Sequence, residues 1–148
     1  MKKFSMIKIA FGIFMAAILL IGTAAPSFAA KNNISALGSE VSNQKKYTMY
    51  LGTNDKDSQV QEIPTATIRA QMHEICMKYV SGYTVSEMEG FYRDDAGNDY
   101  HEVSLVYVFI DAPIDALRKI MDEALVKFNQ SSILLEESKG KSTFYSGK

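Results

Sequence analysis

The sequence predicts an α+β domain with the ferredoxin-like order strand, helix, strand, strand, helix, strand, in which an antiparallel sheet has both helices on one face. Two segments, one after Pro64 and one after Asp111, have apolar residues at the three- and four-residue spacing of an amphipathic helix. Between them, residues 94–98 have the Asp, Gly and Asn composition of a tight turn that joins two β-like segments. The second of these segments, residues 100–110, is long, β-branched and aromatic, and it predicts a central strand.

The first half of the domain begins with a strand at residues 47–52, where β-branched and aromatic side chains alternate before the polar run at residues 54–57. The helix after Pro64 has its apolar stripe at Ile68, Met72, Ile75, Cys76 and Tyr79. Ser81 and Gly82 follow this stripe, and Gly at this position is typical of a helix C-terminus.

The second half begins with a short extended piece at residues 83–85 and a strand at residues 89–93, which leads into the turn and the long strand. We expect the second helix to start near Asp111, with the Asp111 carboxylate as its cap and Pro113 in its first turn. Its apolar face consists of Leu117, Ile120, Met121, Ala124, Leu125 and Phe128. A strand at residues 132–136 and a short C-terminal strand at residues 142–145 complete the prediction.

The first 29 residues have the pattern of a cleavable export signal. Lys2, Lys3 and Lys8 precede an uncharged apolar stretch, and Ser27 and Ala29 supply the small residues that signal peptidase requires. The alternative is a membrane anchor, but the apolar stretch at residues 9–21 is shorter than the roughly 20 residues that span a bilayer. We therefore expect cleavage after Ala29, a secreted or periplasmic bacterial product with no membrane association, a flexible leader at residues 30–46 and one domain at residues 47–146.

Composition excludes several classes of function. Removal of the three signal lysines changes the formal net charge from −1 to −4, and nucleic-acid binding requires clustered positive charge instead. With one cysteine the chain forms no internal disulfide. No Gly-rich phosphate loop or Gly-x-Ser-x-Gly elbow occurs in the sequence, and we expect no cofactor.

Metal sites are also disfavoured by the sequence. His73 and His101 are the only histidines, and Met77 stands where a zincin helix needs its second His. Asp55 and Asp57 have the spacing of the first two ligands of a calcium loop, but Val60 stands where that loop needs Gly. We expect no metal.

The long strand is apolar on both faces. One face has Val103, Leu105, Tyr107 and Phe109, and the other has Val106, Val108 and Ile110. Two helices cover only one face of a four-stranded sheet, so another element must cover the second face. We weigh a homodimer packed face to face, local cover from the leader and residues 81–88, and a ligand pocket. Covering each large side chain is worth roughly 1.5–3 kcal/mol.

The predicted domain contains five short motifs, in this order: Tyr50-Leu51-Gly52, Gly82-Tyr83-Thr84-Val85, Glu89-Gly90-Phe91-Tyr92, Glu102-Val103-Ser104 and Phe128-Asn129-Gln130-Ser131-Ser132-Ile133-Leu134. In order and spacing, the chain resembles a family of small exported bacterial proteins catalogued only as a domain of unknown function, over residues 47–145. Many relatives carry Trp where this chain has Phe91 or Tyr92. The resemblance implies the fold and export and no activity.

Glu102 and His101 are the candidate catalytic residues. They are adjacent on a strand and so point to opposite faces, which prevents a direct dyad. Glu102 shares its face with Ser104 and could meet Tyr50, Glu89 or Tyr92 from neighbouring strands, so these five residues form the candidate binding site. The alternative is that Glu102 and Ser104 only satisfy groups near the strand end. We expect structural roles for the remaining candidates. Cys76 should be buried in the core, and Gln130 should form hydrogen bonds at a helix end. The tyrosines should lie in the core or in a dimer interface.

Two functional hypotheses follow. The first is a non-catalytic exported domain that forms a homodimer and binds a small molecule or a protein partner through the open sheet face. The second is a small enzyme in which Glu102, with a nearby Tyr or His101, acts as acid and base in an aromatic-lined pocket. A closed concave pocket around Glu102 would favour the enzyme, whereas a flat, water-exposed carboxylate would favour binding or a structural role.

Overall fold

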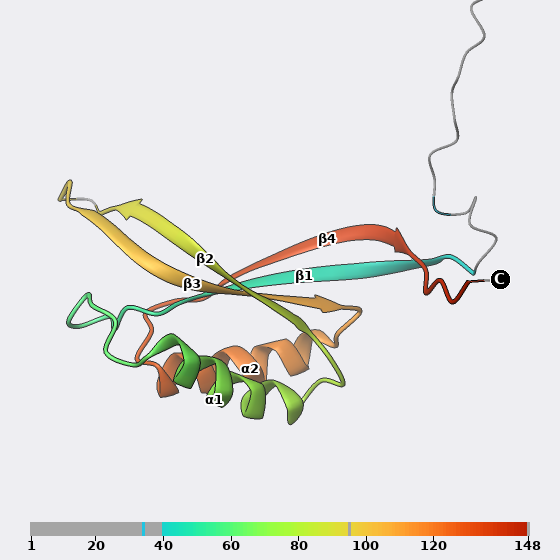
Figure 1. Ribbon diagram of the computed structural model, residues 1–148, viewed down its shortest axis with the longest axis horizontal. Helices are drawn as coiled ribbons and strands as arrows, with labels where there is room; N and C mark the ends of the chain where they lie inside the picture. The colour runs from blue at the N-terminus through green and yellow to red at the C-terminus, as the bar shows by residue number, and fades with distance from the viewer. Residues whose placement is uncertain (1–33, 35–39, 95, 148) are drawn as a thin grey trace, which may run out of the picture. The chain divides into compact units, whose positions relative to one another are not determined.

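The computed structural model describes residues 34, 40–94 and 96–147, and the predicted export signal and most of the predicted leader lie outside these residues. The elements are β1 (Ser42–Gly52), α1 (Thr65–Met77), β2 (Thr84–Arg93), β3 (Asp99–Ile110), α2 (Ile114–Lys127) and β4 (Leu134–Ser142) (Figure 1). The four strands form one antiparallel sheet in the order β2-β3-β1-β4. The predicted ferredoxin-like α+β fold is confirmed.

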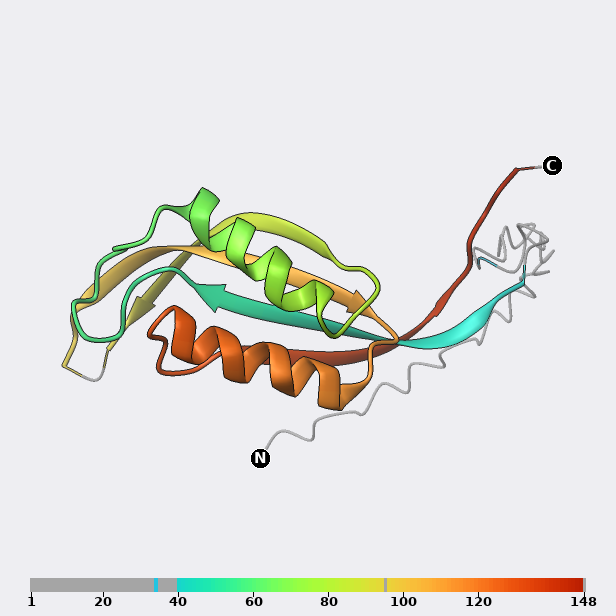
Figure 2. The same cartoon turned by 90° about the horizontal axis from the view of Figure 1, so that it is seen from below.

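Both helices lie on the same face of the sheet (Figure 2). The core forms between that face and the helices, where alternate residues of the two central strands point toward α1 and α2. Its largest fully buried side chains are Tyr107, Phe109, Met49, Leu51, Ile68, Met72, Leu105, Leu117 and Ile120. The helix periodicity and the strand alternation read from the sequence therefore identify this core.

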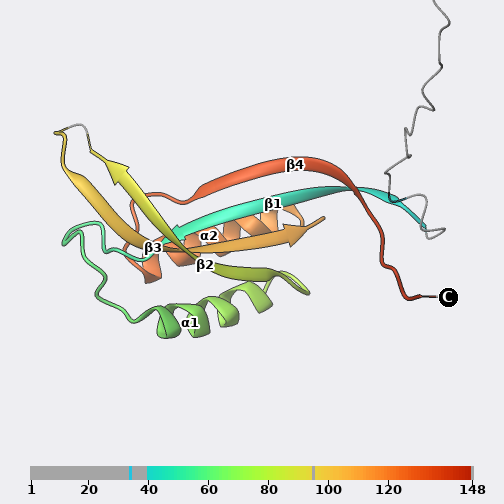
Figure 3. The ribbon, with the colours of Figure 1, turned by 45° about the horizontal axis from the view of Figure 1, so that its top comes forward.

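Two boundaries differ from the prediction because backbone pairing, and not apolar pattern, determines them. β1 begins at Ser42, so residues 42–46 of the predicted leader belong to the sheet and pair with β4. β4 is one continuous strand from Leu134 to Ser142, and the separate C-terminal strand expected at residues 142–145 does not form. Beyond the pairing of Lys46 with Ile110, β1 and β4 continue without β3 as a two-stranded ribbon (Figures 1 and 3).

The start of α2 also differs from the prediction. Pro113 is the N-cap residue, and no side chain caps the helix. Asp111 has a φ of 53° and donates its backbone N–H to the carbonyl of Lys45 at 2.7 Å, so it turns the chain out of β3 instead of capping the helix.

The face of the sheet away from the helices, called the open face below, is only partly apolar. Cover by residues 81–88 was one alternative for this face, but residues 84–88 form the first part of edge strand β2. Val106 is 6% exposed on this face, whereas Met88, Ile110 and Leu134 are about half exposed. None of the helices in the described residues is long and apolar enough to cross a membrane.

Candidate functional site

A cavity of about 340 Å³ lies on the open face, near the end of the sheet where β1 finishes. Its floor comes from β1 and β3, and its walls come from the segment after β1, the end of β2 and the connection from α2 to β4. The lining residues are Tyr50, Gly52, Asn54, Asp55, Lys56, Gln59, Tyr92, Glu102, Ser104, Gln130, Ser131, Ser132 and Leu134. This volume is at the lower end of the range for small-molecule sites.

Glu102 lies in the floor of this cavity between two glycines. Its register partner on β2 is Gly90, and its carboxylate reaches across to β1, where a Cβ built on Gly52 would lie 2.6 Å from Glu102 Oε2. A Cβ on Gly90 would lie 3.7 Å from Glu102 Cγ and 3.0 Å from Ser104 Oγ. The missing side chains therefore provide the space in which the Glu102 side chain lies across the sheet.

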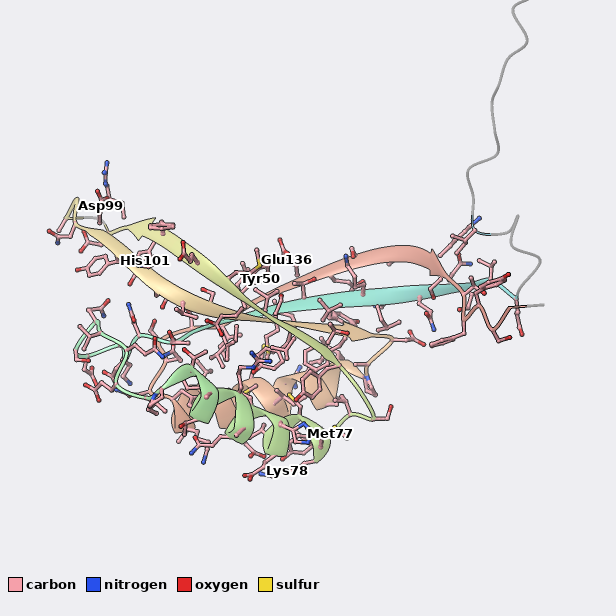
Figure 4. The ribbon with its side chains drawn as sticks, viewed as in Figure 1. Tyr50, Met77, Lys78, Asp99, His101 and Glu136 are labelled. Carbon is pink, nitrogen blue, oxygen red and sulfur yellow. The ribbon has the colours of Figure 1, made fainter. Side chains whose placement is uncertain are left out.

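Hydrogen bonds orient the two tyrosines of the cavity. Tyr50 donates its hydroxyl to Glu136 at 2.9 Å, and both side chains lie on the open face (Figure 4). Tyr92 donates its hydroxyl to Gln59 Oε1 at 3.1 Å, which joins the end of β2 to the segment after β1. Burial raises the pKa of the Tyr92 phenol, and the nearby Glu102 and Asp94 carboxylates raise it further. Both phenol protons are thus used in holding the cavity wall.

The segment after β1 is fixed to the end of α2 by a separate set of hydrogen bonds. Asn129, which has a φ of 48°, donates its amide to both Asp55 Oδ2 and Asp57 Oδ2 at 2.8 Å. The Asn129 hydrogen bond, with those from the backbone N–H groups of Asp57 and Ser58, lowers the pKa of Asp55. Gln130 donates to the carbonyls of Asn54 and Phe128. Gln130 is therefore a helix-end hydrogen-bond donor and also part of the wall.

The same contacts involve Asp55 and Asp57, the two carboxylates that have the spacing of calcium-loop ligands. The Asn129 amide occupies the position between the two carboxylates. Among the described residues, no group of three or more His, Cys, Asp or Glu side chains has the arrangement to hold a metal ion.

Glu102 differs from the other acidic residues near the cavity because its carboxylate has little local compensation. Its one hydrogen bond within the described part of the chain is a long one, 3.4 Å from the backbone N–H of Asn54. The ion pairs formed by the described residues do not include Glu102. A half-buried carboxylate therefore faces the cavity with free acceptor capacity.

The structure brings Tyr50, Tyr92, Glu102 and Ser104 together in this cavity, but not the other two candidates. The β2–β3 register places Gly90 beside Glu102, so Glu89 pairs with Val103 and is exposed on the opposite side of the sheet. His101 is also directed away from Glu102 and stacks on Phe91 with 4.5 Å between ring centroids (Figure 4). His101 therefore gives no assistance to Glu102 in this arrangement.

The sequence did not identify the cavity walls. Asn54, Lys56 and Gln59 lie in an irregular segment that no pattern assigns to the open face. Gly52 and Gly90 could have indicated part of the cavity from the sequence, because glycine inside a strand is typical of close approach by another group. Knowing which group approaches them requires the register of three strands.

The other chemically notable groups lie away from this cavity. Burial raises the pKa of the Cys76 thiol to about 12, as expected for an unreactive core cysteine. A larger hollow of about 510 Å³ flanks the β1–β4 ribbon and is lined by Lys45, Lys139 and Lys141 among others. Its lysines are exposed, and one of them, Lys45, is paired with Glu137.

The fold and the open-face cavity define the class as a small ferredoxin-like α+β domain with a polar hollow that contains the half-buried carboxylates of Glu102 and Asp55. The chain belongs to the family described as "Protein of unknown function (DUF3574)", which matches residues 46–144. No curated protein matches the sequence.

Several solved structures are similar to the chain. A phage SAM lyase in complex with S-methyl-5′-thioadenosine has 13% identity and a TM-score of 0.53, with 71% of this chain and 93% of that chain covered. The same enzyme in its apo state gives 15% identity and a TM-score of 0.50, with 72% and 94% covered. CutA from Synechococcus elongatus gives 10% identity and a TM-score of 0.40, with 72% and 88% covered. At these identities the two lyase structures support the fold alone.

Proposed function

We propose that this protein is an exported domain that binds a small polar molecule in the open-face cavity. The observation that carries the proposal is the position of Glu102: a half-buried carboxylate held over Gly52, without an ion-pair partner among the described residues and directed into a hollow of small-molecule size. A partly exposed carboxylate with free acceptor positions can accept hydrogen bonds from a ligand, and the hollow is large enough to hold one.

Binding is favoured over catalysis by the neighbours of Glu102. An acid–base enzyme needs a second group placed to exchange a proton with the substrate, and the two phenols of the cavity already donate their protons to Gln59 and Glu136. The catalytic alternative therefore rests on Glu102 with Tyr92, whose phenol pKa is raised. If the protein converts a retained compound, and if this conversion requires Glu102, the catalytic alternative is favoured.

The decisive experiment is native mass spectrometry of the protein purified from its own host. We expect a small molecule to be retained by the wild type and lost in Glu102→Gln. Glu89→Gln is the matched control, because it makes the same change on the adjacent strand and on the other side of the sheet. Retention by Glu102→Gln, or absence of any bound molecule in the wild type, would overturn the proposal. S-methyl-5′-thioadenosine, named with the phage enzyme, belongs among the reference compounds.

A homodimer packed through the open face is the second part of the proposal. It is supported by Met88, Ile110 and Leu134, which are 54%, 50% and 57% exposed on the face that carries Val106. Contact with a second copy would remove these apolar groups from water and close the cavity. Light scattering in the micromolar range should give twice the chain mass, and Leu134→Glu should reduce it to one chain.

The control for this experiment is Val126→Glu, because Val126 is 84% exposed on α2, away from the open face. A wild-type mass of one chain, or equal behaviour of the two variants, would contradict the face-to-face dimer. For localisation, the proposal is export to the periplasm or the medium, based on the pattern of residues 1–29.

A further inference from the structure

We propose that the ligand of the open-face cavity is a small organic cation whose ammonium group binds the Glu102 carboxylate. This inference rests on the proposed binding function and specifies its ligand class. It follows from which hydrogen-bonding groups of the cavity are already used and which remain free.

Several of the groups that could donate protons to a ligand are already engaged. The hydroxyls of Tyr50 and Tyr92 donate to Glu136 and Gln59. The Gln130 amide donates to two backbone carbonyls, of Asn54 and Phe128. The lining also holds Lys56 and three serine hydroxyls, but an anionic ligand would lie against the carboxylates of Glu102 and Asp55, which repel it.

The acceptors of the cavity, in contrast, remain available. An ionised carboxylate has about four acceptor positions, and the described contacts of Glu102 use one of them, at the long distance of 3.4 Å. The other carboxylate in the lining, Asp55, accepts hydrogen bonds from Asn129 and from the backbone of Asp57 and Ser58, so it is already satisfied. Glu102 is thus the group that selects a ligand, and it selects a positively charged donor.

The tyrosines and the lysine of the lining are consistent with this choice. The aromatic rings of Tyr50 and Tyr92 line the same cavity, and the faces of such rings attract ammonium groups. Lys56 is the cationic residue of the lining, but its side chain is exposed and makes no ion pair with Glu102 among the described residues. It therefore leaves the Glu102 charge uncompensated.

The test compares choline with its neutral isostere 3,3-dimethylbutan-1-ol by titration calorimetry at low ionic strength. The two probes have the same shape and differ by the positive charge. We expect wild type to bind choline at least tenfold more tightly than the isostere, and we expect Glu102→Gln to remove this preference. Glu89→Gln, with the same charge change outside the cavity, should retain it.

Equal affinity for the two probes would overturn the cation assignment, and so would the absence of saturable binding of choline, ethanolamine and putrescine at millimolar concentration. These results differ from failure of the proposed function. If native mass spectrometry recovers an anionic or neutral compound whose retention requires Glu102, the binding site stands and only the ligand class is wrong. If nothing is retained and no cation binds, both proposals fail.

Discussion

Substitution of Gly52 by alanine tests whether the position of the Glu102 carboxylate matters for binding. The added Cβ would lie 2.6 Å from Glu102 Oε2 and 2.8 Å from Oε1, whereas ordinary contact begins at 3.4 Å. The carboxylate must therefore move by the difference, at least 0.8 Å. Because it is the end of a flexible side chain beside a cavity, it can move without disturbing the backbone of β1 or β3.

The substitution should change the free energy of unfolding only slightly but should weaken ligand binding strongly. Alanine is favoured over glycine inside a strand by about 0.5–1 kcal/mol, which offsets the cost of moving Glu102, so the free energy of unfolding should change by less than about 1 kcal/mol. A hydrogen bond to a charged group contributes about 1.5–3 kcal/mol, so its loss should weaken choline binding by about tenfold to a hundredfold. Urea denaturation and titration calorimetry measure the two quantities separately.

Gly140→Ala is the matched control for this substitution. Gly140 also lies inside a strand, β4, and a Cβ there would have nothing within 4 Å, so stability should rise by no more than about 1 kcal/mol and choline affinity should stay close to wild type. Normal stability with undiminished affinity in Gly52→Ala would refute the role of the Glu102 carboxylate in binding. A loss of several kcal/mol in unfolding free energy would show instead that Glu102 is held rigidly and has a structural role.

Further predictions concern the core, the cavity wall and the N-terminus. Tyr107→Phe removes a buried hydroxyl that has no hydrogen-bond partner in the described structure, so unfolding free energy should rise by about 1 kcal/mol; a decrease would indicate an internal water that binds it. The pKa of Asp55 is lowered, so its stabilisation is complete above the ordinary value of 3.8 and is lost as the pH falls through the folded-state pKa. Asp55→Asn should therefore lower the melting temperature at pH 7, and in acid the melting temperatures of the variant and the wild type should become similar. A difference in melting temperature that does not depend on pH would contradict this assignment. Cys76, with its pKa raised to about 12, should react with a disulfide reagent only on unfolding, which rapid labelling of the native protein would disprove. N-terminal sequencing of the exported protein should begin at Ala30, and recovery of an intact N-terminus would exclude cleavage.

The fold could be predicted because its signals are local and repeated. The apolar stripe of α2 and the alternation along β3 each extend over many residues, and a helix or strand period determines which side chains face the core. The ends of β1 and β4 could not be predicted in the same way. Residues 42–46 and residues 138–142 are polar, and they form strands because each supplies hydrogen bonds to the other. Sequence periodicity carries no information about such pairing.

The candidate site was predictable in part for the same reason. Residues two apart on a strand share a face, so Glu102 and Ser104 were placed together, and the aromatic Tyr50 and Tyr92 were placed on neighbouring strands. The prediction for Glu89 was wrong because it depended on the register of β2 against β3, and a shift of one residue moves a side chain to the other face. The register puts Gly90 at that position instead.

This one-residue difference changes what the site can do. With Glu89 beside Glu102, two carboxylates would lie together and one would hold a proton, an arrangement suited to acid–base chemistry. With Gly90 there, Glu102 has no second carboxylate beside it on β2, and the described residues give it one long hydrogen bond, from the backbone N–H of Asn54, and no ion pair. A single accessible carboxylate attracts a cation more readily than it shares a proton. The register of β2 and β3 therefore supports ligand binding over catalysis, and it makes the positive charge of the ligand the property to test first.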